Sequence, residues 1–166
     1  AALGKVLPAL PARLGAPVLI VQHMPAYFTD SLAKSLAKHC PLPVSEAADG
    51  APLEANHVYL APGGRQFEAV KGRNGGLAAR ITDGPPVKNC RPSVDVLFQS
   101  LAEGCGATTA AAVMTGMGDD GCDGVRALKA RGAYCITQSR DTCTVYGMPR
   151  AVDVAGLSDE QVDLED

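Results

Sequence analysis

Short runs of apolar residues alternate along the chain with longer segments in which apolar residues recur every three or four positions. The runs predict strands buried on both faces, and they lie at 18–21, 108–114 and 133–137. The periodic segments predict helices, and they lie at 27–40, 93–104, 121–129 and 148–154. Strands that alternate with helices in this way predict an α/β fold, with a mostly parallel, doubly wound sheet as the middle of three α/β/α layers.

One segment departs from this alternation, because it holds three short strand candidates with no helix between them. These candidates lie at 57–60, 67–70 and 77–81. The last two are separated by Asn74-Gly75-Gly76, and a glycine after asparagine is a strong hairpin signal because glycine adopts positive φ without strain. We therefore predict an antiparallel hairpin inserted into the sheet.

Length and composition predict one globular domain rather than two. The chain has 166 residues, 46% of them hydrophobic, with no low-complexity linker and no internal repeat. We place this domain at 1–157 and interpret the acidic segment 158–166 as a frayed tail. At the other end, Ala1-Ala2-Leu3 enters a helix without a capping residue. Because an α/β domain that opens on a helix has usually lost a strand, we expect the first strand upstream of the chain.

Charge and polar residue types argue against several function classes. Lys and Arg total 15 against 18 Asp and Glu, and no run of like charges accompanies the net charge of -3, which disfavours nucleic-acid and anionic-membrane partners. No apolar stretch reaches the roughly 18 residues of a membrane span, and no signal-peptide pattern opens the chain. We therefore expect a cytoplasmic protein without membrane insertion. The three histidines and six cysteines lack metal-ligand spacing, which predicts neither a metal site nor a cofactor.

Two polar segments follow predicted strands, at the sheet edge where parallel sheets bind their ligands. Residues 22–25 follow the first apolar run, and residues 115–121 follow the second. His23 in the first segment is a candidate proton carrier, and a carboxylate from Asp119 or Asp120 in the second would fix its tautomer. The glycines between 116 and 121 would leave backbone amides pointing outward as an oxyanion site.

Each of these features also has a structural interpretation. A lone histidine at a strand end is more often structural than catalytic, and the two aspartates could cap the helix that follows them. The glycine-rich turn could cradle a phosphate, although it lacks nucleotide-binding spacing. A nucleophile is also missing, because no serine of the chain lies in a sharp glycine turn after a strand and Cys122 is interpreted as structural. An enzyme, a binding module without catalysis and a nucleotide-binding protein all stay open at this point.

Six stretches, in this order along the chain, form a pattern more specific than any single motif. They are 18–25 (VLIVQHMP), 59–63 (YLAPG), 83–87 (DGPPV), 91–98 (RPSVDVLF), 115–121 (TGMGDDG) and 146–150 (YGMPR). Together they resemble the catalytic domain of the CheB-type chemotaxis-receptor protein-glutamate methylesterases. The resemblance implies hydrolysis of γ-glutamyl methyl esters on the signalling helices of chemoreceptors, with release of methanol, and deamidation of receptor glutamines.

The same resemblance assigns the site residues. The family's catalytic histidine corresponds to His23, its catalytic aspartate to Asp120, and the backbone amide implicated in its oxyanion hole to Met117. Its nucleophilic serine lies in an S-T-G-G turn that would end upstream of Ala1, so we expect the chain as given to be inactive alone. Many relatives also carry a phosphorylatable receiver domain before the esterase domain. A non-catalytic receptor-binding module of the same fold is the alternative.

Overall fold

The computed structural model describes residues 2–166 and forms two compact units, Leu3–Ser93 and Val94–Asp166. Each unit has a parallel sheet and helices of its own. Ala1, with which the predicted domain begins, lies outside the described residues. The assignment of 1–157 as a single catalytic domain stays a prediction.

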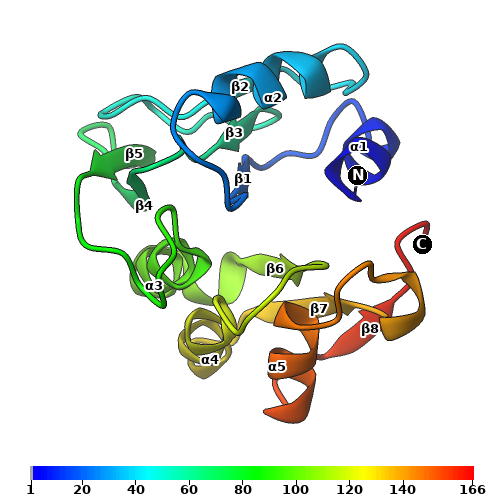
Figure 1. Cartoon of the computed structure of the whole chain (residues 1–166). Helices are drawn as coiled ribbons and strands as arrows, with labels where there is room; N and C mark the ends of the chain where they lie inside the picture. Colours follow the sequence, from blue (N-terminus) through cyan, green and yellow to red (C-terminus); the bar gives the residue numbers. More distant parts are fainter. Residues whose placement is uncertain (1) are drawn as a thin grey trace. The chain divides into compact units, whose positions relative to one another are not determined.

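The first unit is built on a three-stranded parallel sheet of order β1-β3-β2 (Figure 1). Its strands are β1 (Val18–Ile20), β2 (Val44–Glu46) and β3 (Val58–Leu60), and its helices are α1 (Ala2–Val6), the 3-10 helix η1 (Leu7–Ala9) and α2 (Phe28–Ala37). The central strand β3 is buried at every position. The core of this unit is made of large aliphatic side chains from the helices, the loops and β3, namely Leu7, Leu36, Leu42 and Val58.

The predicted antiparallel hairpin is confirmed, although it forms a two-stranded sheet of its own. Strand β4 (Gln66–Lys71) pairs along its whole length with β5 (Leu77–Thr82). Gly75 has a φ of +81° in the connecting turn, as the Asn-Gly signal predicts. Phe67 and Ile81 lie opposite each other and both are buried, so one face of the hairpin contributes to the core.

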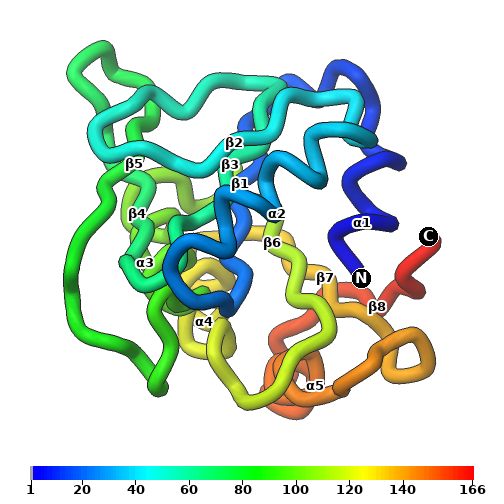
Figure 2. The backbone as a smooth tube through the Cα atoms, turned by 45° about the horizontal axis from the view of Figure 1, so that its top comes forward, coloured from blue at the N-terminus to red at the C-terminus, as the bar shows by residue number. Residues whose placement is uncertain are grey.

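The second unit contains another parallel sheet, of order β6-β7-β8. Its elements are α3 (Val94–Gly104), η2 (Gly106–Thr108), β6 (Ala110–Val113), α4 (Cys122–Ala130), β7 (Tyr134–Gln138), η3 (Arg140–Thr142), α5 (Met148–Val154) and β8 (Glu160–Val162). Helices α3 and α4 lie side by side in both views of the backbone (Figure 1 and Figure 2). Gly124 permits this close approach, because a Cβ there would lie 2.5 Å from the Cβ of Phe98.

The α/β fold with mostly parallel sheets is confirmed, but the apolar pattern predicts neither β2 nor β8. The segment 158–166 is not frayed, because β8 pairs with β7 and the amide of Ser139 donates to the carbonyl of Val162 at 2.7 Å. Both strands are three residues long and only partly apolar. They form because a neighbouring strand offers backbone hydrogen-bonding groups. This neighbour is distant in sequence, so the local sequence does not predict the strands.

Candidate active site

His23 lies in the first unit, on the segment that leaves the carboxyl end of β1. This strand ends at Ile20, whose carbonyl oxygen accepts the amide of Ala61 at 2.8 Å. The side chain of His23 is exposed. The prediction that this histidine stands just past a strand is confirmed, although β1 is half-buried rather than buried on both faces.

The backbone after His23 is held by close contact with the turn that follows β3. A Cβ at Gly63 would lie 2.2 Å from the carbonyl oxygen of Pro25 and 2.8 Å from that of Met24. The amide of Gly63 also donates to Oγ1 of Thr29 at 2.9 Å, and this threonine is buried. Only a residue without a Cβ allows this approach, so the glycine fixes the path of the segment that carries His23.

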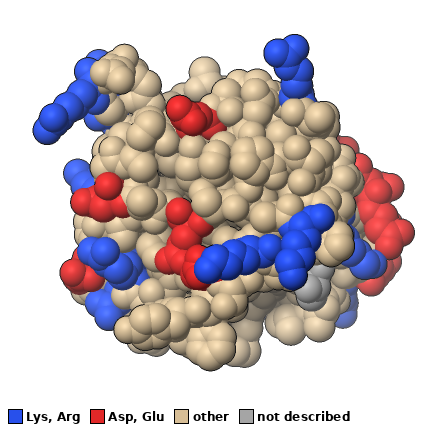
Figure 3. Space-filling model, turned by 90° about the horizontal axis from the view of Figure 1, so that it is seen from above, with Lys and Arg blue, Asp and Glu red and all other residues tan. Residues whose placement is uncertain are grey.

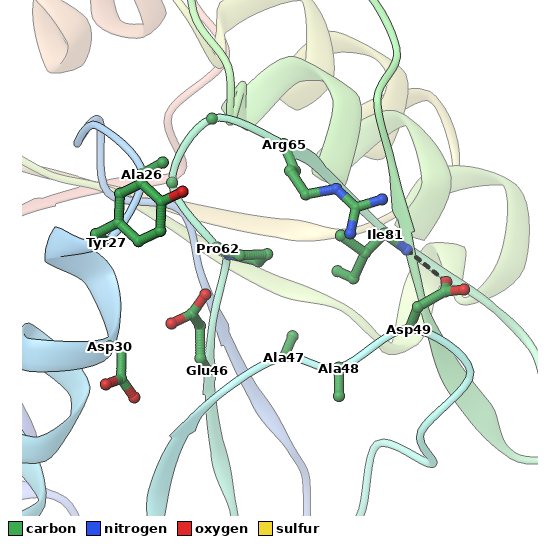
Figure 4. A pocket seen from close by; sticks show the side chains of 12 residues that line it. Ala26, Tyr27, Asp30, Glu46, Ala47, Ala48, Asp49, Pro62, Arg65 and Ile81 are labelled. Atoms are coloured by element: carbon green, nitrogen blue, oxygen red, sulfur yellow. Dashed lines mark hydrogen bonds between the residues drawn. The ribbon is translucent and has the colours of Figure 1, made fainter.

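A hollow of about 460 Å³ opens in the first unit, past the carboxyl ends of β2 and β3 (Figure 4). Its wall includes the side chains of Tyr27, Glu46, Arg65 and Ile81. Burial raises the pKa of the Glu46 carboxyl, and the negative charge of Asp30 raises it further. The hollow thus combines an aromatic ring with a carboxyl group of increased proton affinity, in a position where parallel sheets bind ligands.

Two aromatic side chains stand exposed at the start of α2. Tyr27 is 94% exposed and has a φ of 73°, and Phe28 is 61% exposed. A bulky residue in the left-handed region carries backbone strain, and aromatic side chains are enriched at protein interfaces.

The face of the molecule seen in Figure 3 is mostly uncharged, with acidic and basic side chains scattered over it.

Asp120 lies in the second unit, where its buried carboxylate caps the start of α3. One carboxylate oxygen accepts the amide of Val94 at 2.8 Å and the other accepts that of Asp95 at 3.0 Å. Asp95 in turn accepts the amides of Gly121 and Gly124 at 3.0 and 2.7 Å. The capping interpretation of Asp120 is therefore corrected, because it caps α3 while Asp95 caps α4, the helix that follows Asp120. Two amide donors hold the Asp120 carboxylate in one orientation.

Met117 lies in the turn between β6 and α4, with its side chain 83% exposed. Among residues 2–166, no protein oxygen accepts the amide hydrogen of Met117. The next residue, Gly118, has a φ of +88° and shapes the turn. An amide that has no acceptor in the described part of the chain is able to donate to an oxyanion. The role of Met117 as an oxyanion donor stays a prediction.

Residues 145–148 hold this turn in place, although no separate structural role was predicted for them from the sequence. Gly116 accepts the amides of Gly147 and Met148 at 3.1 and 2.9 Å, and its own amide donates to the carbonyl of Val145 at 3.0 Å. The signal that could have identified this contact is glycine at both 116 and 147, since close backbone approach favours glycine. The stretch 146–150 contributed to the resemblance alone.

The predicted site residues fall into two groups, one in each unit. His23 belongs to the first unit, while Met117 and Asp120 belong to a single turn of the second. Within each unit, the backbone that carries them is fixed by glycine contacts or by capping hydrogen bonds. The pairing of His23 with Asp120 stays a prediction, as does the absence of a metal or a cofactor.

Residues 1–166 match the family model described as CheB methylesterase. The chain belongs to the CheB methylesterase family. It is 47% identical over 159 residues to a protein-glutamate methylesterase/protein-glutamine glutaminase of Desulfotalea psychrophila, and 47% identical over 164 residues to a protein-glutamate methylesterase/protein-glutamine glutaminase 1 of Vibrio vulnificus. These matches cover 95% and 99% of this chain but 44% and 43% of the relatives. The chain thus spans less than half the length of the curated relatives it matches.

A solved structure from this family has the same fold. The crystal structure of the Thermotoga maritima CheB methylesterase catalytic domain matches with a TM-score of 0.95 and 36% sequence identity, and the match covers 99% of this chain and 86% of that chain. The family resemblance drawn from the six sequence stretches is therefore confirmed.

Proposed function

We propose that this chain provides the histidine and aspartate of a protein-glutamate methylesterase, which hydrolyses γ-glutamyl methyl esters on chemoreceptors and deamidates receptor glutamines. The observation that carries the proposal is the turn of residues 116–121. The Met117 amide, which has no acceptor among the described residues, lies there three positions before the buried, doubly hydrogen-bonded carboxylate of Asp120. Acyl transfer needs both, a donor for the oxyanion and a carboxylate that orients the base. The names and identities of the relatives support the same substrate class.

The reaction begins with a serine hydroxyl that loses its proton to His23 and attacks the ester carbonyl. Asp120 orients the imidazole and stabilises the imidazolium, and the Met117 amide donates to the oxyanion of the tetrahedral intermediate. His23 then returns the proton to the leaving group, so that methanol departs and an acyl-enzyme remains. Water activated by His23 hydrolyses the acyl-enzyme to the glutamate side chain and the free serine.

We infer that the serine in this mechanism is not among the 166 residues. We place this serine in an S-T-G-G turn after a strand upstream of Ala1, so the chain alone should release no methanol from methylated receptor. The test compares this chain with a protein extended upstream through that strand and turn. Turnover by the extended form only is the expected result, and turnover by the 166-residue chain would overturn the assignment of the nucleophile.

The role of His23 is tested in the extended protein. His23→Gln should abolish methanol release while the far-ultraviolet circular dichroism stays unchanged. His39→Gln, the same substitution at another exposed histidine of the first unit, is the matched control and should retain turnover. Near-normal methanol release by the His23 variant would show that another group is the base.

Exposed Tyr27 and Phe28 favour a second candidate, a receptor-binding module without catalysis. In that case the extended protein would bind methylated receptor yet release no methanol.

The proposed partners are the signalling helices of chemoreceptors and a regulatory receiver domain, and the proposed location is the cytoplasm. Among the described residues, none of the helices has the length and apolar character that crossing a membrane requires.

A further inference from the structure

We propose that Gly147 is a positioning residue for the esterase reaction, because it lets the segment before α5 hold the Met117 amide in its working position. The inference rests on the proposed function, since it takes the turn of residues 116–118 as the oxyanion site. Gly147 would touch no substrate atom. It acts through the backbone of the turn that does.

A side chain at position 147 would have no space. A Cβ there would lie 2.7 Å from the carbonyl oxygen of Gly116, 3.0 Å from the amide nitrogen of Gly118 and 3.2 Å from the Cα of Met117. These are backbone atoms on both sides of the Met117 amide, so a side chain at 147 must displace the turn or be displaced by it.

At Gly116, the atoms closest to a Cβ would belong to a side chain and not to the backbone. A Cβ at Gly116 would meet the sulfur and Cγ of Met148, the nearer at 2.4 Å. A methionine side chain has three rotatable bonds and can move aside, whereas the peptide backbone around Met117 cannot. The tight constraint on the turn therefore lies at 147.

Backbone conformation does not explain the glycine at 147. Its φ is -103° and its ψ is -66°, on the right-handed side of the map and not in the left-handed region that favours glycine. Glycine is thus required here for space and not for a left-handed conformation. Substitution by alanine would leave the local backbone geometry accessible and would act on the neighbouring turn.

Hydrogen bonds hold the two segments at this separation. Residues Gly116 and Tyr146 form a parallel bridge, and the amides of Gly147 and Met148 both donate to the carbonyl of Gly116, at 3.1 and 2.9 Å. Oγ1 of Thr115 accepts the amide of Val145 at 2.9 Å and donates to the carbonyl of the same residue at 3.2 Å. The turn cannot move away from Gly147 without breaking several of these bonds.

The segment before α5 is itself anchored to the sheet. The hydroxyl of Tyr146 donates to one carboxylate oxygen of Asp153, and the hydroxyl of Thr137 on β7 donates to the other at 2.6 Å. The phenol of Tyr146 is protonated at neutral pH, because its ordinary pKa is 10.0 and the bond to Asp153 raises this pKa further, so it remains a donor. The segment that contains Gly147 is therefore fixed to α5 and β7, and the turn of residues 116–118 lies directly against it.

The catalytic consequence follows from the steep geometric dependence of oxyanion stabilisation. Loss of one oxyanion donor lowers kcat by about 10²–10³ in enzymes that use such a site, and a misplacement of about 1 Å costs about 10². Gly147→Ala should therefore lower kcat for methanol release by about tenfold to a hundredfold. KM should change little, because the donor acts on the transition state rather than on the bound ester.

The test measures kcat and KM in the serine-containing extended protein for three variants. Gly104→Ala is the matched control, because a Cβ at this position of the same unit would meet nothing within 4 Å. Thr115→Val removes the hydroxyl that links the turn to Val145 and should lower kcat less than Gly147→Ala does. A fall in kcat ordered Gly147→Ala, Thr115→Val, Gly104→Ala supports the proposal, and an unchanged kcat in Gly147→Ala overturns it.

A second measurement separates this proposal from the proposed function. Gly147→Ala in the 166-residue chain should shift the Met117 and Gly118 amide signals in a ¹⁵N-¹H spectrum, while Gly104→Ala should leave them unchanged. If these signals move and kcat does not, the turn is not the oxyanion site and the proposed mechanism fails. If neither moves, the turn is not positioned by Gly147. If Gly147→Ala unfolds, the milder Thr115→Val decides, and its normal kcat would overturn the proposal.

Discussion

Asp95 and Asp120 cap each other's helices. Asp120 precedes α4 in sequence but accepts the first two amides of α3, while Asp95, inside the first turn of α3, accepts the amides of Gly121 and Gly124 at the start of α4. Both side chains are buried. The two carboxylates therefore tie the starts of the two packed helices together, and the predicted catalytic aspartate is part of this bond network.

Loss of either carboxylate should destabilise the fold. Asp120→Ala or Asp95→Ala leaves two buried amides without their acceptor, at a cost of about 1–3 kcal/mol in the free energy of unfolding. Chemical denaturation of each variant measures this. Asp141→Ala, at an exposed position of the same unit, is the control and should change stability little. Wild-type stability in both buried variants would contradict the capping role.

The close contact at Gly63 gives a prediction for the first unit. Gly63→Ala places a methyl group against the carbonyl oxygens of Met24 and Pro25, so we expect a loss of about 1–3 kcal/mol, as for other overpacked sites. In the extended protein, methanol release should also fall, because the displaced segment carries His23. Thermal melting and turnover give the two readouts. Gly76→Ala, where a Cβ would meet nothing within 4 Å, should behave as wild type.

The side chain of Met117 should matter little for the chemistry. In the proposed mechanism the donor is its backbone amide, and the side chain is 83% exposed, so Met117→Ala retains the donor. We expect kcat to stay within about threefold of the wild-type value, since surface substitutions away from special contacts have small effects. A fall of tenfold or more in kcat would place the side chain in the reaction.

The ion pair between Lys129 and Asp159 predicts a dependence of stability on pH. Lys129 lowers the pKa of the Asp159 carboxyl below its ordinary value of 3.8, with help from the amide of Cys135. A carboxyl whose pKa is lowered in the folded state stabilises the fold above its ordinary pKa, and the contribution is lost as the pH falls through the folded value.

Asp159→Asn should therefore have a lower Tm than the wild type at neutral pH, and the difference should shrink as the pH falls below 3.8. Thermal melts across this range measure it, with the exposed variant Asp141→Asn as the control. A Tm difference that is constant with pH would show that the carboxylate charge of Asp159 does not stabilise the fold.

Local sequence patterns predict the elements whose structure is decided by interactions between residues close in sequence. The helix at 148–154 has the predicted bounds, and the Asn-Gly turn places the hairpin because glycine decides its geometry. Strands β2 and β8 lack an apolar pattern and depend on the neighbouring strands β3 and β7. The contact of Gly147 with the turn at 116–118 joins two loops that are distant in sequence. Glycine at 116 and at 147 permits the contact, but no local pattern pairs the two positions.

In the candidate site too, the sequence indicates the residues with local signals but not the contacts that depend on packing. His23 and the turn of residues 115–121 are recognisable because each follows a predicted strand, where parallel sheets place their ligands. The partner of the Asp120 carboxylate is not recognisable in this way, because it depends on how α3 and α4 pack. The sequence therefore predicted a capping role for Asp120 but assigned it to the wrong helix.

The capping role of Asp120 affects how relatives of this chain should be interpreted. A relative that does not hydrolyse esters would still need a carboxylate at this position to hold the start of α3. Selection for folding alone would preserve it, so the presence of this aspartate in a homologue is weak evidence of activity. If His23 is the base, as we propose, this exposed histidine is the more informative marker when a genome is searched for active members of the family.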